Sequence, residues 1–110
     1  MSLTQARFHD LIDAIQQTVE DAFDDYQTDV DLENSAGVLT IRFENGSQLI
    51  LSRQEAIRQL WVAARSGGFH FDYDQATERW LCDSTNETLG ELLSRAVLEQ
   101  GGEALLFEEL

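Results

Sequence analysis

Basic residues, cysteine, proline and long apolar runs are all rare or missing in this sequence of 110 residues. There is no lysine, and seven arginines face 21 acidic residues, so the net charge is −14. Such a chain has no basic surface to neutralise phosphates, which excludes nucleic acids and anionic membranes as partners. No apolar run approaches the roughly 20 residues that a membrane-spanning helix needs. The absence of proline points to no particular function.

The cysteine count and the first residues indicate where the protein works. Cys82 is the only cysteine, so an internal disulfide is impossible and a reducing compartment is expected. The first ten residues lack the apolar core of a secretory signal, and Asp10 is untypical of an acid-poor transit peptide. We therefore expect a cytoplasmic protein. Apolar residues make up 43% of the chain, which fits one folded domain over residues 1–110.

Acidic residues crowd the N-terminal third of the chain. Nine of the 21 lie within the first 33 residues, where Arg7 is the one basic residue. Crowded like charges raise the energy of the folded state, and a fold that tolerates them usually has a cation or a basic partner to meet them. The crowding therefore points to a metal ion or a basic partner surface.

Apolar residues recur with helical spacing at both ends of the chain. A stripe at i, i+3, i+4 and i+7 predicts an amphipathic helix over about residues 3–25, with Ser2 and Gln5 in a capping-box relation. A second stripe predicts a helix that begins at a capping box of Thr88 and Glu91 and ends at two glycines. The apolar residues after these glycines are expected to pack back against the helices.

Between the two helices the apolar period changes to two, which is typical of strands. Six strands are predicted, over residues 29–33, 37–43, 47–52, 59–65, 69–73 and 79–82. Asn45-Gly46 indicates a hairpin with a type I′ turn, which needs positive φ at both central residues. The expected fold is α+β: a two-layer α/β sandwich with the N- and C-terminal helices packed on one face of a twisted antiparallel sheet of about six strands. The other sheet face should be open to solvent.

The acids of the first helix fall opposite its apolar stripe, and those of the first strand alternate with apolar residues. Carboxylates are hard oxygen donors that suit iron, manganese, calcium or magnesium. If the strand lies beside the helix, both groups form one continuous patch. The candidate metal ligands are Glu20, Asp21, Asp24, Asp25, Asp29, Asp31 and Glu33.

A solvated acidic face that only aids solubility is the alternative to a metal site. Helix stability alone does not select Asp24 and Asp25, because acids near a helix C-terminus oppose the macrodipole by roughly 0.3–1 kcal/mol each. An EF-hand beginning at Asp29 is excluded, since Asn34 would replace the turn glycine and Thr40 the bidentate glutamate. Any metal site here should be exposed, shallow and weak.

Motifs of conventional enzymes are absent: the sequence has no Ser/His/Asp set, phosphate loop, CxxC or HExxH. His9 and His70 are the only imidazoles, and a lone surface histidine is more often unremarkable than a ligand. His70 alternates with two phenylalanines, so it should face the open side of the sheet. Cys82 is expected to be a buried or half-buried structural thiol.

Trp61 is expected on the open sheet face, because Leu60 and Val62 alternate with it and should face the helices. An exposed tryptophan is a typical interface anchor. In a reversed register Trp61 would be a core residue instead. Trp80 is the better candidate for the core.

Several motifs along the chain form a specific pattern, in which ENGS is followed by RQE and LW, all after an acidic first helix. They are Phe8-His9, Thr18–Asp21, Asp24-Asp25, GVLTIRFENGSQLIL over Gly37–Leu51, Arg53–Glu55, Gln59–Trp61, Ser66–Tyr73 and Trp80–Asp83. Together they resemble the frataxin family, in its bacterial form, over essentially the whole chain. The resemblance implies the two-layer fold above and weak surface binding of Fe²⁺ and Fe³⁺ at the seven candidate ligands.

The resemblance also implies a role in iron–sulfur cluster assembly, through contact with the cysteine desulfurase and its scaffold protein. Gln54 and Trp61 match the partner-facing sheet residues of the family, and Ser52 and His70 are assigned to the same surface. Three departures from the family are visible. Ser52 stands where the family often has asparagine, and Ala56 stands where it usually has proline. The turn after Asp25 is about two residues short, so the ligands that follow it are expected to be arranged differently.

Three functions follow from these observations. The leading one is an iron-binding adaptor that regulates the desulfurase, acting as a monomer that could oligomerise with iron. The second is a ferroxidase or iron-storage protein that uses the same carboxylates. The third is an acidic interaction module that needs no metal.

Overall fold

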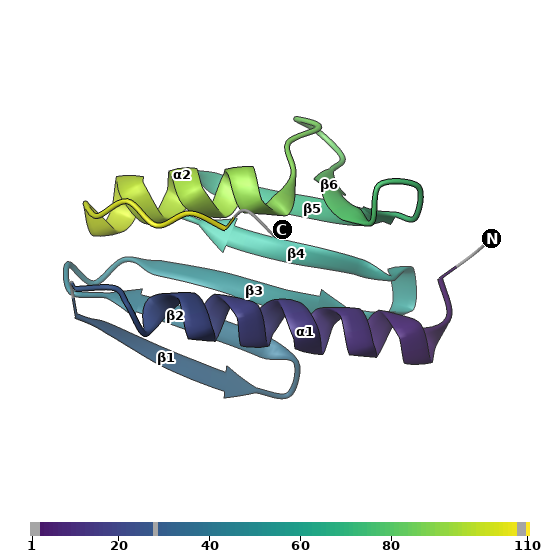
Figure 1. Ribbon diagram of the computed structural model, residues 1–110, viewed down its shortest axis with the longest axis horizontal. Helices are drawn as coiled ribbons and strands as arrows, with labels where there is room; N and C mark the ends of the chain where they lie inside the picture. The colour runs from purple at the N-terminus through teal and green to yellow at the C-terminus, as the bar shows by residue number, and fades with distance from the viewer. Residues whose placement is uncertain (1–2, 28, 108–109) are drawn as a thin grey trace.

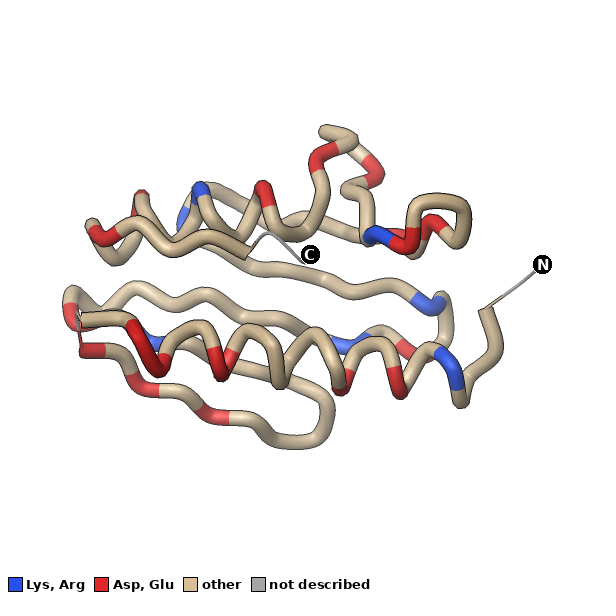
Figure 2. Tube along the Cα trace, viewed as in Figure 1, with Lys and Arg blue, Asp and Glu red and all other residues tan. Residues whose placement is uncertain are grey.

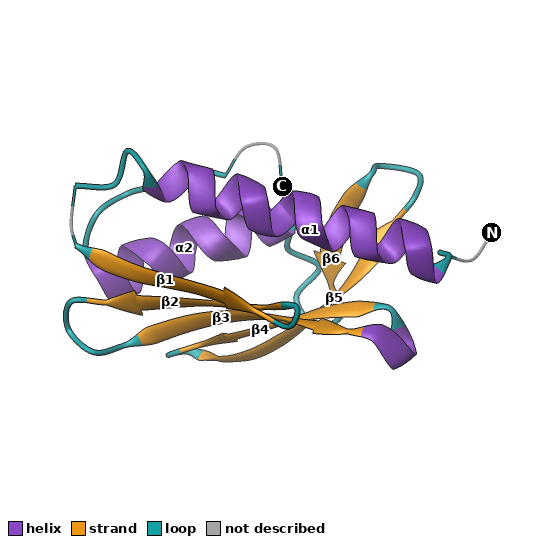
Figure 3. Ribbon diagram, turned by 90° about the horizontal axis from the view of Figure 1, so that it is seen from below, coloured by secondary structure: helices purple, strands orange, loops and turns teal. Residues whose placement is uncertain are grey.

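The computed structural model describes residues 3–27, 29–107 and 110, which form two layers (Figure 1; Figure 3). In chain order the elements are α1 (Gln5–Phe23), β1 (Val30–Ser35), β2 (Val38–Phe43), β3 (Gln48–Gln54), the 3₁₀ turn η1 (Glu55–Ile57), β4 (Gln59–Ala64), β5 (Gly67–Asp74), β6 (Arg79–Cys82) and α2 (Leu89–Gly101). The six strands form one antiparallel sheet in chain order, from β1 at one edge to β6 at the other. Both helices cover the same face of this sheet, so the predicted fold is confirmed.

Alternation along the strands decides what each sheet face carries. Leu39 and Ile41 of β2 and Leu60 and Val62 of β4 are at most 1% exposed, and they face the helices. The helices contribute the predicted apolar stripes to the same core, with Phe8 of α1 fully buried. Neither of the two described helices is long and apolar enough to cross a membrane.

The hairpin between β2 and β3 is confirmed, but its predicted turn type is wrong. The Gly46 N–H donates to the Phe43 carbonyl at 2.9 Å, and Gly46 has a φ of 88° whereas Asn45 keeps a negative φ. This is a three-residue loop with a glycine bulge, which needs positive φ at one residue only. The turn with positive φ at both central residues lies between β1 and β2, at Ala36 (52°) and Gly37 (80°).

The start of α1 also differs from the prediction. The N-cap is Thr4, whose hydroxyl accepts a hydrogen bond from the Arg7 N–H at 3.2 Å. Gln5 is the first residue inside the helix, so the predicted capping box of Ser2 and Gln5 is wrong. Ser2 itself lies outside the described residues.

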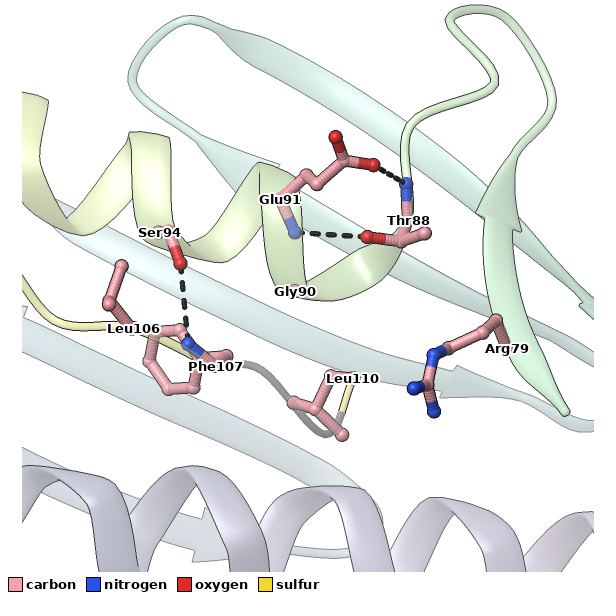
Figure 4. Close-up of a pocket in the computed structure, with 8 residues that line it drawn as sticks. All are labelled: Arg79, Thr88, Gly90, Glu91, Ser94, Leu106, Phe107 and Leu110. Atoms are coloured by element: carbon pink, nitrogen blue, oxygen red, sulfur yellow. Dashed lines mark hydrogen bonds between the residues drawn. The ribbon is translucent and has the colours of Figure 1, made fainter.

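The start of α2 carries the predicted capping box (Figure 4). The Thr88 N–H donates to the Glu91 carboxylate at 3.0 Å, and the Thr88 hydroxyl accepts from the Glu91 N–H at 3.2 Å. The tail packs back as predicted: Phe107 is 5% exposed, and its N–H donates to the Ser94 hydroxyl at 3.4 Å. The Phe107 carbonyl lies so close to Gly90 that no Cβ would fit there.

Candidate functional site

Acidic residues recur along α1 and β1 (Figure 2). At the end of α1, Asp21, Asp24 and Asp25 are exposed and Glu20 is half-buried. The helix ends at Phe23, so Asp24 is its C-cap, and the last turn holds no basic residue. These four carboxylates add to the negative end of the helix dipole, which makes this end of α1 attractive to cations. We call them the α1 acids.

The acids of β1 point to the other side of the sheet. Asp31 stands opposite Arg42 on the open face, and Glu33, two residues further on, shares that face. Glu33 forms an ion pair with Arg42 at 3.0 Å. Asn34, the residue after Glu33, has the opposite phase and faces the helix layer, where its amide donates to the Gln16 side chain at 3.4 Å. Asp31 and Glu33, the β1 acids, therefore face away from the helix layer that holds the α1 acids.

The carboxylates suit iron by their chemistry but do not converge on one ion. Asp29 is exposed in the connection before β1. Within the described part of the chain, no three carboxylate, histidine or cysteine side chains come together to hold a metal ion. A hard cation that meets only one or two exposed carboxylates keeps most of its water. The arrangement therefore fits weak and exchangeable binding.

A second surface lies on the open face of the sheet, where six side chains form two rows across β3, β4 and β5. The rows are Ser52, Trp61 and His70, and Gln54, Gln59 and Asp72. We call these six residues the Trp61 face. Trp61 lies on the open side as predicted, because its neighbours Leu60 and Val62 are buried under the helices. The Gln54 amide donates to the Ser52 hydroxyl at 3.0 Å.

Contacts within the Trp61 face hold the tryptophan in place. Its indole ring stacks on the His70 ring, with the centroids 4.3 Å apart and the planes inclined by 19°. The indole N–H donates to Gln59 Oε1 at 2.9 Å. Gln59 Nε2 in turn donates to the Asp72 carboxylate at 3.0 Å. Trp61 is half-buried, so part of its ring remains available to a partner.

Gln59 and Asp72 belong to the Trp61 face, but the sequence did not single them out. They lie directly opposite one another in β4 and β5. The signal that could have found them is strand phase, because Gln59 is two residues before Trp61 and Asp72 is two residues after His70. Strand phase identifies them only when the register between β4 and β5 is known, and the sequence alone does not give that register.

His9 has a structural contact. Its Nε2 lies 3.0 Å from the Glu55 carboxylate, which also pairs with Arg53 at 3.2 Å. These side chains place the start of α1 next to the end of β3 and to η1. His9 therefore joins the two layers, at a place remote from the α1 acids along the helix.

Cys82 is a buried thiol, as predicted, with 2% of its surface exposed. Burial raises the pKa of this thiol, but hydrogen bonds from the side chains and backbone of Ser84 and Thr85 outweigh it, so the pKa lies below its ordinary value. A nucleophile must also be reached by its target, and the Cys82 sulfur is enclosed. The thiol therefore has a structural role.

The comparison with known proteins agrees with this geometry. A model of the frataxin-like domain matches residues 1–103. The chain belongs to the frataxin family. Its frataxin relatives include proteins named iron-sulfur cluster assembly protein CyaY from Stutzerimonas stutzeri and Azotobacter vinelandii, each 72% identical over the full 110 residues of both chains. The protein of the same name from Pseudomonas aeruginosa is 68% identical over 98% of this chain and 100% of its own length.

Solved frataxin structures share the fold. Frataxin from Psychromonas ingrahamii superposes with a TM-score of 0.85 at 30% identity, covering 93% of this chain and 95% of its own. Trimeric frataxin from the yeast Saccharomyces cerevisiae, a complex with ferrous iron, gives a TM-score of 0.70 at 21% identity, covering 94% and 90%. At that lower identity, the likeness to yeast frataxin concerns the fold alone.

Proposed function

We propose that this frataxin is an iron-binding adaptor and regulator of iron–sulfur cluster assembly in the bacterial cytoplasm. The observation that carries the proposal is that the molecule has two separate surfaces of different composition. One is the cation-attracting end of α1, and the other is the Trp61 face, on the opposite side of the sheet from the helices. The names of the CyaY relatives, which match over their whole length, support the same process.

The α1 acids have two tasks in this proposal. They hold Fe²⁺ or Fe³⁺ weakly, and they guide the protein to a basic surface on the cysteine desulfurase. Salt screens exposed charges beyond about 8–10 Å at physiological ionic strength, so this attraction speeds encounter more than it holds the complex together. A weak iron site suits a protein that has to release its ion.

The Trp61 face holds the complex of desulfurase and scaffold protein once it has formed. A half-buried tryptophan with amide and hydroxyl neighbours has the composition of a binding hot spot, in which one aromatic anchor dominates and polar groups surround it. The adaptor acts as a monomer, because both of its surfaces are needed for partners.

Charge reversal tests the α1 acids. Replacing Asp24 and Asp25 by lysine is expected to weaken desulfurase binding by about ten-fold, mainly through the association rate, because long-range attraction is lost. The same change at Glu78 and Glu99, two exposed acids on the β5–β6 turn and α2, is the control with equal net charge. Binding is measured by surface plasmon resonance at rising salt, with circular dichroism to verify the fold. Equal effects from both pairs would contradict the proposal.

Titration with Fe²⁺ tests the metal part. Amide NMR signals of residues 20–25 are expected to broaden at low iron, before those of other acidic segments, because four carboxylates gather there. If the signals of the β1 acids broaden first instead, the iron site is wrongly placed. Oxygen consumption separates an adaptor from an enzyme, since sustained catalytic turnover would identify a ferroxidase.

A further inference from the structure

The Trp61 side chain has one hydrogen-bond donor, the indole N–H, and this donor is already paired within the protein. The indole N–H donates to Gln59 Oε1 at 2.9 Å, and His70 covers one face of the ring at 4.3 Å between centroids. A partner that docks on Trp61 therefore meets the uncovered part of the ring. The indole N–H at the polar edge of that ring already has its acceptor in Gln59. The indole can be buried by a partner without leaving an unpaired N–H, which would be costly.

Asp72 decides which way the Gln59 amide points. An ionised carboxylate can only accept hydrogen bonds, so the group that faces it at 3.0 Å must be the amide nitrogen of Gln59. The amide oxygen is then turned toward Trp61. Asp72, Gln59 and Trp61 thus form a directed chain across two strands, and reversing the amide would break both bonds.

We propose that Gln59, oriented by Asp72, is a positioning residue that presents Trp61 to the partner as a preformed anchor. This rests on the proposed function, and it adds how the tryptophan is recognised: through its apolar ring and not through its N–H. A side chain that is already ordered loses less conformational entropy on binding, so preorganisation raises affinity without a new contact.

The first test removes the acceptor and keeps the side-chain length. Gln59→Met is expected to weaken binding to the desulfurase–scaffold complex by about 3- to 10-fold. In the free protein it should shift the Trp61 indole N–H signal and speed its exchange with water, whereas the indole signal of buried Trp80 stays unchanged as an internal reference. Gln48→Met is the matched control, because Gln48 is exposed on the same sheet face, opposite Arg42 and away from Trp61.

The second test exchanges the two polar groups. Gln59→Glu keeps an acceptor for the indole but places two carboxylates side by side, so it should weaken binding too. In Gln59→Glu/Asp72→Asn, the amide of residue 72 can donate to the carboxylate of residue 59, which still accepts from Trp61. This double variant has the wild-type net charge, and it is expected to restore both the indole signal and partner binding.

The outcomes separate this inference from the proposed function. If Trp61→Ala leaves partner binding unchanged, the Trp61 face is not the docking surface and the proposed function loses that part. If Trp61→Ala weakens binding but Gln59→Met does not, the docking surface stands and the positioning role is wrong. The positioning role is also wrong if the double variant restores the indole signal without restoring binding, because Gln59 would then contact the partner directly.

Discussion

At the scale of single residues, Trp61 and Trp80 show how one residue type can do two different jobs. Trp80 is 3% exposed and packs in the core against Phe8, with the ring centroids 6.1 Å apart. Trp61 lies on the opposite side of the sheet, half-buried against His70. Core burial makes Trp80 a determinant of stability, whereas the position of Trp61 leaves it available for binding.

Trp61→Ala is therefore expected to weaken partner binding with a stability loss of only about 1 kcal/mol, the worth of one aromatic pair. Trp80→Ala should cost about 3–5 kcal/mol, because it leaves a cavity in the core. Urea unfolding of both variants, followed by circular dichroism, measures the difference. Similar losses for the two variants would mean that Trp61 is part of the core after all.

At the scale of elements, the start of α2 depends on the capping box of Thr88 and Glu91. Hydrogen bonds from the Thr88 backbone and side chain lower the pKa of the Glu91 carboxyl below its ordinary value of 4.5. A carboxyl whose pKa is lowered by folding stabilises the protein above its unfolded-state pKa. That contribution is lost as the pH falls through the lower, folded-state value.

Glu91→Gln separates the charge of this cap from its hydrogen bond. The amide oxygen of glutamine can still accept from the Thr88 N–H, but it does not titrate. We expect the variant to lose less stability than the wild type between about pH 7 and about pH 3. Urea midpoints at the two pH values measure this, with Glu99→Gln on the last turn of α2 as the control. An unchanged pH dependence in Glu91→Gln would show that the ionised carboxylate adds nothing to the cap.

At the scale of the whole molecule, the net charge of −14 is distributed unevenly. Red positions line α1 and β1 in Figure 2, and basic positions are few along both. The folded state therefore carries a self-repulsion that is strongest near the end of α1. That repulsion is the cost of a surface that attracts cations.

Salt is expected to stabilise this frataxin by screening the repulsion, so its melting temperature should rise between about 20 mM and about 500 mM NaCl. Asp24→Asn/Asp25→Asn should raise the melting temperature at low salt and reduce its salt dependence. Glu78→Gln/Glu99→Gln removes the same charge, but it should raise the melting temperature less, because Glu99 already has Arg95 at 3.7 Å. Differential scanning calorimetry compares the two pairs. Indistinguishable curves would show that the net charge matters and its crowding does not.

Much of the fold could be predicted because local spacing carries it. The helical stripes, the six strands, the cap at Thr88 and the outward position of Trp61 all depend on residues close to one another in the chain. The errors arose where local signals were weak or ambiguous. Ala36 gives no warning of the positive φ that it adopts, since alanine has no preference for it, and Asn45-Gly46 fits more than one kind of hairpin turn.

The sequence by itself determined the layers, the order of elements and the crowding of acids, because periodicity and charge are properties of the chain alone. Only the tertiary structure decided which of these residues meet. A shift of one residue in strand register turns every side chain to the other face, so the separation of Asp31 and Glu33 from the α1 acids depended on how β1 pairs with β2. The same holds for Gln59 and Asp72, which are neighbours only because β4 and β5 align them.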